Sequence, residues 1–312
     1  MENIPWVEKY RPDNFDEIVL DPVNKRIFKN IIKTKYFPNL LFYGPPGTGK
    51  TTTIVNLIKE YQGDTNKLST IHLNASDERG IDIIRNQINQ FVNSKGFYDS
   101  KMKFVVLDEV DYMTKNAQLA LKYLLQSNCY NIRFCLICNY ISKIDISLKD
   151  EFVCMRFNQL PKNEIIGFLE NILSKEKILF DSEILNSIQE HFNSDIRSMI
   201  NYTQLNQNVY DLKNNILTIE TYKMLNELFI NQVNTNEIID KFNEISIKYN
   251  HDKLYIIKRY LNYMIKNTKI PNINDFLNDI ELLIHNNKSS IEHILKFFIN
   301  IMKNNYKIDL KK

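Results

Sequence analysis

The residues from Gly44 to Thr51 match the pattern Gly-x-x-x-x-Gly-Lys-Thr, which is typical of a loop that binds phosphate groups. Glycines let such a loop turn its backbone N–H groups toward phosphate oxygens, at the positive end of the following helix. An apolar run, Leu40–Tyr43, precedes the loop, and Thr52–Ile58 follows it with helical spacing. The sequence therefore predicts binding of a nucleoside triphosphate through Gly44, Pro45, Pro46, Gly47, Thr48, Gly49, Lys50, Thr51 and Thr52.

Four polar side chains have the types needed to act on the phosphates. In this pattern the lysine, Lys50, holds the β and γ phosphates, and the hydroxyl of Thr51 is a ligand of Mg²⁺. Asp108 and Glu109 directly follow the apolar run Phe104–Leu107, at the carboxyl edge of a predicted strand, where ligands of an α/β sheet bind. We assign Asp108 to the metal, and Glu109 to general-base work on the water that attacks the γ phosphate.

Two more residues are candidates for the same site. Asn139 follows the strand-like run Arg133–Cys138, and its amide could orient the attacking water. Arg197 falls in the first turn of a predicted helix that either Ser194 or Asp195 can cap. An arginine in such a position is usually solvated. Arg197 can sense the γ phosphate only if the helical region folds over the nucleotide.

Two groups of residues near the site have a structural interpretation. Asp111 fits the role of a cap for the following helix better than Asp108 or Glu109 does. The pair Cys135 and Cys138 has the spacing of half a zinc site, but it lies in a strand-like run and lacks a second pair. We therefore expect the cysteines to be buried free thiols; they are Cys129, Cys135, Cys138 and Cys154.

Strand-like and helix-like segments alternate in the first half of the chain, which favours a parallel sheet covered by helices. The expected strands include Leu40–Tyr43, Thr70–Asn74, Phe104–Leu107 and Arg133–Cys138. After Gly167 the sequence has one proline and no glycine, so we expect almost only helices there. We place a boundary near Pro161 and a softer one near residues 226–234. The expected domains are 1–160, 161–226 and 227–312.

Composition excludes few functions. The chain has 312 residues, 44% of them hydrophobic and 25% charged, which is an ordinary globular balance. Neither a basic, apolar start nor a run of membrane-spanning length is present, so we expect a soluble intracellular protein without a membrane partner. The net charge of +3 is too small to imply a nucleic-acid surface by itself. Any such surface must be a local basic face.

Taken together, these residues resemble the small subunits of replication factor C, the sliding-clamp loaders of the AAA+ ATPase group. The resemblance covers roughly residues 5 to 206, and the tail after residue 226 resembles the family only in its helical character. The segments that carry it are Pro5-Trp-Val-Glu-Lys-Tyr-Arg-Pro12, the phosphate loop, Leu73–Ile81, Asp108-Glu-Val-Asp111, Arg133–Tyr140 and Arg197.

The resemblance implies an AAA+ domain with a parallel five-stranded sheet, then a small helical lid and an all-α collar. It implies an ATPase that uses ATP and Mg²⁺ and is active within an assembled complex, a hetero-pentamer that loads a clamp of the PCNA type on primer-template DNA during replication. The corresponding compartment is the nucleus or a viral replication compartment in the cytoplasm.

The resemblance also implies roles for single residues. Val7 and Arg11 would flank the base and phosphates of the nucleotide, and Asn139 and Arg197 would be its first and second sensors. Contacts with the DNA backbone would come from Arg85, Asn89 and Lys115. Such contacts are independent of base sequence and weaken with salt.

One departure from the family pattern affects the expected chemistry. The family carries Ser-Arg-Cys before its fifth strand, and that arginine completes the ATP site of the adjacent subunit. Here the corresponding position is Glu151, whose carboxylate would repel a γ phosphate. Lys122 and Tyr123 likewise replace paired arginines, and Gln126 replaces a glutamate. Two explanations stay open. The changes are either neutral drift in a fast-changing lineage or the mark of a subunit that serves no neighbouring ATP site.

Three functions are compatible with these observations. The residues Lys50, Thr51, Asp108 and Glu109 favour a clamp-loader ATPase. The changed positions keep open a structural subunit that binds ATP with little hydrolysis of its own. A branch-migration helicase would share the phosphate loop, but the segments Pro5–Pro12 and Leu73–Ile81 favour the loader.

Overall fold

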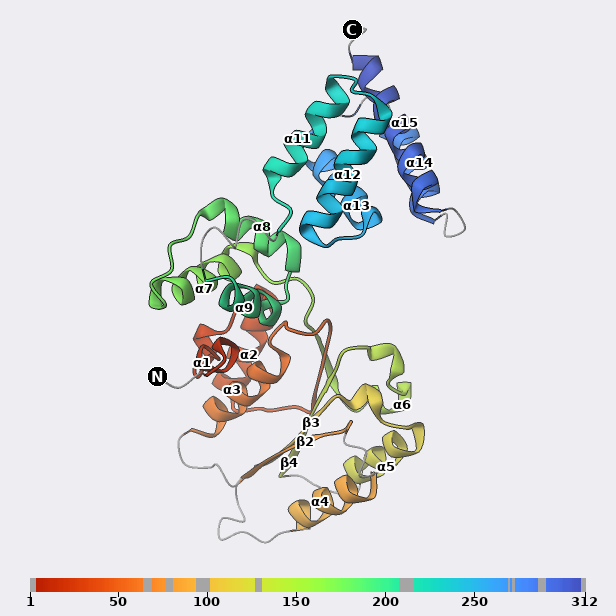
Figure 1. The fold of residues 1–312 in the computed structure, drawn as a ribbon. Coiled ribbons are helices and arrows are strands. Elements are labelled where there is room, and N and C mark those ends of the chain that lie inside the picture. Colours follow the sequence, from red (N-terminus) through yellow and green to blue (C-terminus); the bar gives the residue numbers. More distant parts are fainter. Residues whose placement is uncertain are drawn as a thin grey trace. The chain divides into compact units, whose positions relative to one another are not determined.

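The computed structural model describes residues 4–63, 69–76, 81–93, 102–126, 131–207, 216–268, 270, 273–285 and 290–309. The chain forms two compact units (Figure 1). Unit 1 consists of Met1–Phe180 and Phe192–Asn206, and unit 2 consists of Asp181–His191 and Gln207–Lys312. The division into domains 1–160, 161–226 and 227–312 stays a prediction.

Unit 1 is built on a parallel sheet, as the sequence predicts, and has the five strands that the family resemblance implies. The strand order is β2-β3-β4-β1-β5. Because the strands are parallel and β4 lies between β3 and β1, the carboxyl ends of β1, β3 and β4 lie at the same edge of the sheet. The loop that follows β1 begins at this edge. The strands are β1 (Leu40–Tyr43), β2 (Thr70–Asn74), β3 (Lys103–Asp108), β4 (Ile132–Cys138) and β5 (Val153–Arg156).

Both faces of this sheet are covered by helices, which explains why its strands are nearly continuous apolar runs. Phe42 packs into one core with Phe28 and Leu57, which lie on α2 and α3. Leu41, the preceding residue of β1, points to the other face and joins a second core with Leu121 of α5. Figure 1 shows the resulting three layers of unit 1.

Several helices of unit 1 begin at a side-chain cap. The carboxylate of Asp21, for example, accepts hydrogen bonds from the backbone N–H groups of Val23 and Asn24, and Pro22 occupies the first helical position. The α-helices are α1 (Trp6–Lys9), α2 (Pro22–Thr34), α3 (Lys50–Gln62), α4 (Ile81–Asn93), α5 (Lys115–Gln126), α6 (Ile146–Lys149), α7 (Lys162–Lys175) and α9 (Ile196–Leu205). Short 3₁₀ turns are η1 (Phe15–Glu17), η3 (Val110–Tyr112) and η4 (Ile141–Lys143).

Unit 2 is helical throughout its described part, and aromatic rings fill its core. Tyr260 and Phe298 are fully buried at the centre of this core, where their ring centroids lie 6.1 Å apart. Ile257, Leu261 and Met264, which recur at helical spacing on α13, also contribute to this core. Its helices are α8 (Ser182–Phe192, all but the last residue), α11 (Ile219–Ile230), α12 (Thr235–Tyr249), α13 (Lys253–Asn267), α14 (Ile273–His285) and α15 (Ile291–Asp309).

Candidate functional site

Glycines shape the loop between β1 and α3 because the backbone needs positive φ angles and close approaches there. Gly44 has a φ of 143°, and a Cβ on it would lie 1.7 Å from the carbonyl oxygen of Phe157. Gly47 has a φ of 73°, and a Cβ on it would lie 1.8 Å from Oδ1 of Asp195. A side chain at either position would therefore be strained and would collide with neighbouring atoms. The loop conformation depends on glycine at both places.

Lys50 is buried at the start of α3, and its ammonium group is fixed by three acceptors. Nζ donates hydrogen bonds to the carbonyl oxygens of Gly44 and Pro45, both at 2.7 Å, and to Oδ1 of Asn139 at 3.0 Å. Burial lowers the pKa of Lys50, and the nearby Asp108 carboxylate opposes this shift. The lysine thus connects the phosphate loop after β1 with the residue that follows β4.

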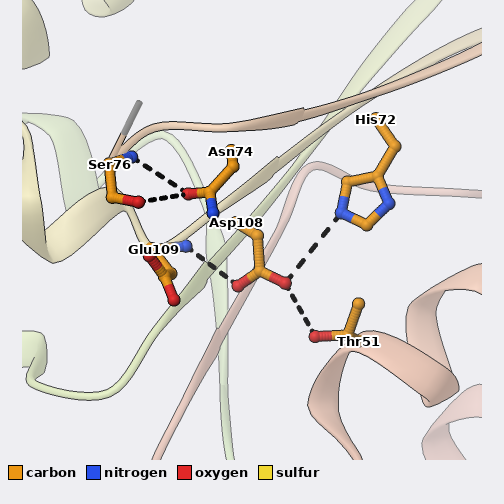
Figure 2. A network of polar contacts seen from close by, with 6 residues as sticks. All are labelled: Thr51, His72, Asn74, Ser76, Asp108 and Glu109. Atoms are coloured by element: carbon orange, nitrogen blue, oxygen red, sulfur yellow. Dashed lines mark hydrogen bonds and ion pairs between the residues drawn. The ribbon is translucent and has the colours of Figure 1, made fainter. Parts of the chain in front are cut away.

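The Asp108 carboxylate is the centre of a second polar network, drawn in Figure 2. The hydroxyl of Thr51 donates a hydrogen bond to Oδ2 of Asp108 at 2.7 Å, and the backbone N–H of Glu109 donates one to Oδ1 at 2.9 Å. His72 on β2 has its Nε2 3.9 Å from Oδ2 of Asp108. On the same edge, Oδ1 of Asn74 accepts hydrogen bonds from the backbone N–H and hydroxyl of Ser76.

The chemistry of this network fits Mg²⁺ better than a transition metal. Thr51 and Asp108 present adjacent hard oxygen atoms, the kind that Mg²⁺ prefers. Within the described ranges, no group of three His, Cys, Asp or Glu side chains could hold a metal ion. Mg²⁺ suits such a site because it usually takes one or two protein ligands and completes its shell with water and phosphate oxygens.

Glu109 has an unusual backbone conformation for a residue with a side chain. Its φ of 58° and ψ of 36° lie in the left-handed region, just after β3 and before η3. Such conformations cost free energy and occur often at functional sites. Glu109 lines the same pocket as Lys50 and Asp108, so the strained turn places a second carboxylate beside the phosphate loop.

A pocket of about 470 Å³ contains most of the residues predicted to bind nucleotide. Those on its wall are Val7, Arg11, Pro46, Gly47, Gly49, Lys50, Thr51, Thr52, Asp108, Glu109, Asn139 and Arg197. Gly44, Pro45 and Thr48 do not line the pocket. The carbonyl groups of Gly44 and Pro45 accept hydrogen bonds from Lys50, and the hydroxyl of the buried Thr48 donates one to the Pro45 carbonyl. Lining residues that the sequence analysis missed are Tyr10, Pro12, Ile18, Val19, His72, Ile137, Phe168, Ile196 and Ile200.

The N-terminal segment that carries Val7 and Arg11 is attached to the helices on the other side of the pocket. The backbone N–H of Trp6 donates a hydrogen bond to the side-chain carbonyl of Gln204 at 2.9 Å, and the hydroxyl of Tyr10 donates one to Glu176 at 2.5 Å. Partners 166 to 198 residues away carry no local sequence signal. Tyr10 could have been found only from its place between the two predicted residues.

Arg197 reaches the pocket because the start of α9 contacts the phosphate loop. Asp195, not Ser194, caps α9: its Oδ1 accepts the backbone N–H of Ser198 at 3.0 Å. The backbone N–H of Ile196, the residue after Asp195, donates a hydrogen bond to the carbonyl oxygen of Gly47 at 3.1 Å. The helical region therefore does lie over the loop, which is the condition for Arg197 to sense a phosphate. The sensing role itself stays a prediction.

The expectation that Asp111 caps a helix is wrong. Asp111 is buried within η3, and its Oδ2 accepts the backbone N–H of Tyr140 at 3.3 Å. The hydroxyl of Thr114 instead accepts the N–H of Ala117 at the start of α5. The 3₁₀ turn η3 separates Asp111 from the N-terminus of α5. Its carboxylate links the turn after β3 with the residue after Asn139.

The expectation of buried free thiols is correct for two cysteines and wrong for one. Cys135 and Cys138 are free and buried on β4, and burial raises both pKa values, that of Cys138 to about 12. Cys154 is free but exposed, because β5 is an edge strand with only β1 beside it. Cys129 lies outside the described residues.

The predicted DNA contacts lie on α4 and α5, apart from the residues that line the pocket. Lys115 is exposed at the first position of α5, and Asn89 is half-buried on α4. Arg85 also lies on α4, and its side chain falls outside the described part of the structure. The role of all three residues stays a prediction.

Two of the positions that depart from the family pattern contact each other. The side-chain amide of Gln126, at the end of α5, donates a hydrogen bond of 3.1 Å to a carboxylate oxygen of Glu151. Glu151 follows α6, and both side chains are exposed. The carboxylate at position 151 thus has a donor where a glutamate at position 126 would repel it.

Within the described ranges, no helix is both long enough and apolar enough to cross a bilayer.

Comparison with known proteins supports the assignment of the fold. Residues 40–159 match the model of the AAA family, described as the ATPase family associated with various cellular activities. Among solved structures, the RuvB Holliday junction branch migration motor of Thermotoga maritima superposes with a TM-score of 0.54 over 82% of this chain and 91% of that one. Because the two sequences are 14% identical, this likeness shows the AAA+ fold alone.

Curated relatives give a closer match. Probable replication factor C subunit 5 of Dictyostelium discoideum is 38% identical over 71% of this chain, and replication factor C subunit 3 of Saccharomyces cerevisiae is 39% identical over 65% of it. These matches span 64% and 60% of the relatives, which is less than two thirds of their length. Replication factor C subunit 3 of Schizosaccharomyces pombe is 34% identical over 78% of this chain and 72% of its own length. The similarity to this relative agrees with the five-stranded AAA domain and the assembled phosphate loop. The chain therefore belongs to the replication factor C family.

Proposed function

We propose that the chain is an ATP-driven subunit of a sliding-clamp loader, one that helps to open a clamp and place it on primer-template DNA during replication. The observation that carries the proposal is the joining of Lys50 to Asn139 and of Thr51 to Asp108 within one pocket. Residues from three separate stretches of sequence meet there, each with a side chain suited to one part of phosphoryl transfer.

In this proposal the site works mainly by position and charge. Backbone N–H groups of the loop and the ammonium of Lys50 hold the phosphates, and Thr51 and Asp108 hold Mg²⁺, which neutralises charge that develops on the phosphate oxygens. ATP would displace Lys50 from some of its present carbonyl partners. Glu109 would accept a proton from the attacking water, whose oxygen the Asn139 amide would orient.

The position of α9 suggests how nucleotide binding would reach the rest of the assembly. Arg197 lines the nucleotide pocket, and the hydrogen bond from the Ile196 N–H to the Gly47 carbonyl joins this helix to the phosphate loop. A γ phosphate that attracts Arg197 would hold α9 and the α1 segment attached to it through Gln204. ATP would thus tighten a ring of five different subunits around a clamp of the PCNA type, and hydrolysis would loosen it.

Measuring ATP turnover tests the proposal. The full chain is assayed alone and with its partner subunits, clamp and primed DNA, against the variant Glu109→Gln. Loss of a general base lowers turnover by about 100-fold or more, so the variant should bind ATP while its site turns over slowly. If turnover and clamp loading by the complex are the same with Glu109→Gln, this chain is not an active ATPase.

A structural subunit that binds ATP but hydrolyses little is the second candidate. It is favoured by the Gln126–Glu151 hydrogen bond, because a carboxylate held by a neutral donor would offer no positive charge to a neighbour's nucleotide. The same turnover assay separates the candidates. ATP-dependent assembly that persists in Glu109→Gln without any change in turnover would favour the structural role.

A further inference from the structure

A lysine lies between two exposed tyrosines at the edge of unit 1, outside the nucleotide pocket. The Nζ atom of Lys143 is 5.2 Å from the ring centroid of Tyr112 and 5.2 Å from that of Tyr140. Both distances are in the range of a cation–π interaction. Each tyrosine is nevertheless 61% exposed, an unusual state for two large rings on neighbouring turns.

The two turns that carry these residues are fixed from inside the protein. Tyr112 belongs to η3 and Lys143 to η4. The side-chain N–H₂ group of the buried Gln118 donates to the carbonyl oxygens of both Met113, at 3.2 Å, and Lys143, at 3.1 Å. The exposed rings therefore stand on an ordered base, so that binding of a ligand would cost little conformational entropy.

Charge at this surface favours an anionic partner. Of the carboxylates on the surrounding turns, Glu109 lines the nucleotide pocket and Asp111 is buried. The exposed Asp145 accepts the N–H and hydroxyl of Ser147, and the positive charges of Lys115 and Lys122 act on its carboxylate. Lys143 is exposed, as is Lys115 at the start of α5. Aromatic rings beside lysines match the chemistry of a single-stranded nucleic acid, whose bases stack and whose phosphates attract cations.

We propose that Tyr112, Lys143 and Tyr140 form a platform that binds a single-stranded nucleic acid, with bases stacked on the tyrosine rings and a phosphate next to Lys143. The inference rests on the proposed action on DNA and adds a contact to an unpaired strand. Ring stacking and attraction of a phosphate to a lysine do not depend on base identity, so the platform would tolerate any base sequence.

Binding of a fluorescent oligothymidine strand, measured by anisotropy over a series of salt concentrations, tests the platform. The full chain is used, alone and assembled with its partner subunits, and both Tyr112→Leu and Tyr140→Leu are compared with wild type. Losing one stacked base should weaken binding about tenfold. Lys143→Gln should weaken it and lower the slope of log affinity against log salt by about 1.

Lys35 and Tyr36 provide matched controls on the same unit. Tyr36 is also a strongly exposed tyrosine, and Lys35 also lies 5.2 Å from a tyrosine ring centroid, that of Tyr61. Tyr36→Leu and Lys35→Gln should leave the affinity unchanged. A strand that carries 5-iodouracil should crosslink to Tyr112 or Tyr140, which peptide mass spectrometry would locate.

Equal affinity of the platform variants and wild type would overturn the proposal, and so would crosslinks confined to other residues. A third contrary result is unchanged DNA affinity together with weaker assembly, which would identify a protein interface. If wild type binds no strand at all, the action on DNA also fails, whereas an ineffective platform on a chain that binds DNA leaves the proposed function intact.

Discussion

The nucleotide pocket of unit 1 and the helical core of unit 2 are built under different constraints. Around the pocket, the backbone takes positive φ angles at Gly44, Gly47 and Glu109, and a lysine is buried. In unit 2, Tyr260 and Phe298 pack in a core of apolar and aromatic side chains. The pocket needs particular residue types, while the core needs only the right volume at helical spacing.

A substitution near the pocket should affect function, whereas one in the core of unit 2 should affect stability. The buried cation of Lys50 carries a desolvation cost, which appears as its lowered pKa. A group that is costly to bury and surrounded by acceptors is expected to serve a ligand. Phe298, by contrast, has only stability to contribute. Substitutions in the two regions should therefore give opposite patterns of lost binding and lost stability.

The largest effect on nucleotide binding is expected from Lys50→Met. Two charge-assisted hydrogen bonds to phosphate oxygens contribute about 3 kcal/mol together, so ATP affinity should fall about 100-fold. The free energy of unfolding should change little, because the lost bonds to the Gly44 and Pro45 carbonyls are offset by the end of lysine desolvation. Titration with a fluorescent ATP analogue and urea unfolding measure the two quantities.

Lys59→Met is the control for this substitution. Lys59 is exposed at the other end of the same helix, where its Nζ contacts the carbonyl oxygen of Asp13 at 3.3 Å. The Lys59→Met variant should bind the ATP analogue with wild-type affinity. A Lys50→Met protein with normal ATP affinity would remove the functional contrast between the two regions.

The largest effect on stability is expected from Phe298→Ala. Phe298 is 1% exposed and contacts the rings of Phe229, Phe242 and Tyr260 at centroid distances of 5.8 to 6.1 Å. Removing such a ring from a core costs about 3–5 kcal/mol. Urea unfolding followed by circular dichroism should detect this loss in unit 2.

Phe297→Ala is the matched control, because the neighbouring phenylalanine is 45% exposed. It should lower the free energy of unfolding by about 1 kcal/mol or less. Under native conditions, both variants should bind the ATP analogue with wild-type affinity. Weaker ATP binding by Phe298→Ala would mean that the core of unit 2 contributes to the nucleotide site, contrary to the comparison.

The sequence predicts the pocket well wherever chemistry restricts residue type at short range. The loop from Gly44 to Thr51 is recognisable because only glycine permits its φ angles, and Asp108 and Asn139 are recognisable because each ends an apolar strand. Four of the five parallel strands follow from the same alternation of apolar runs and helical segments, whereas β5, which is largely exposed, is expected only from the family resemblance. Local rules are sufficient for these features.

Long-range contacts limit what the sequence could predict. Phe168 lines the nucleotide pocket from α7, yet nothing in its neighbourhood distinguishes it from a core residue. The Asp111 prediction is wrong because η3 intervenes before α5, and a single 3₁₀ turn has no clear signal. Cys154 is exposed because its strand is at the edge of the sheet, which depends on strand order rather than on local pattern.

A smaller effect, on stability, is expected from the pH dependence of His191 in unit 2. Its Nδ1 lies 3.1 Å from the hydroxyl of Tyr255, which also accepts a hydrogen bond from Arg259. Burial, with Arg259 and the nearby His251, lowers the pKa of His191 from 6.5 to about 4. The unfolded chain therefore binds this proton at a higher pH than the folded protein does.

The contribution of His191 to stability is consequently complete above pH 6.5, declines as the pH falls to about 4 and then levels off. Partial exposure screens the interaction, so the expected loss is about 1–2 kcal/mol. Urea unfolding from pH 7 to pH 4 should show a smaller loss for His191→Gln than for wild type. His293→Gln, at an exposed histidine on α15, should behave as wild type. Identical slopes for all three proteins would contradict this assignment.

The smallest effect is expected from the exposed pair Gln126 and Glu151. A double-mutant cycle with Gln126→Ala and Glu151→Ala should give a coupling energy of about 0.5 kcal/mol or less, because water competes for both side chains. Stability then gives no reason for a carboxylate at position 151.

The same position is tested for function in the assembled complex. Glu151→Arg should raise ATP turnover if a competent site faces this edge. Unchanged turnover would mean that this edge serves no active neighbour, and a coupling above about 1 kcal/mol would instead make the pair part of the fold.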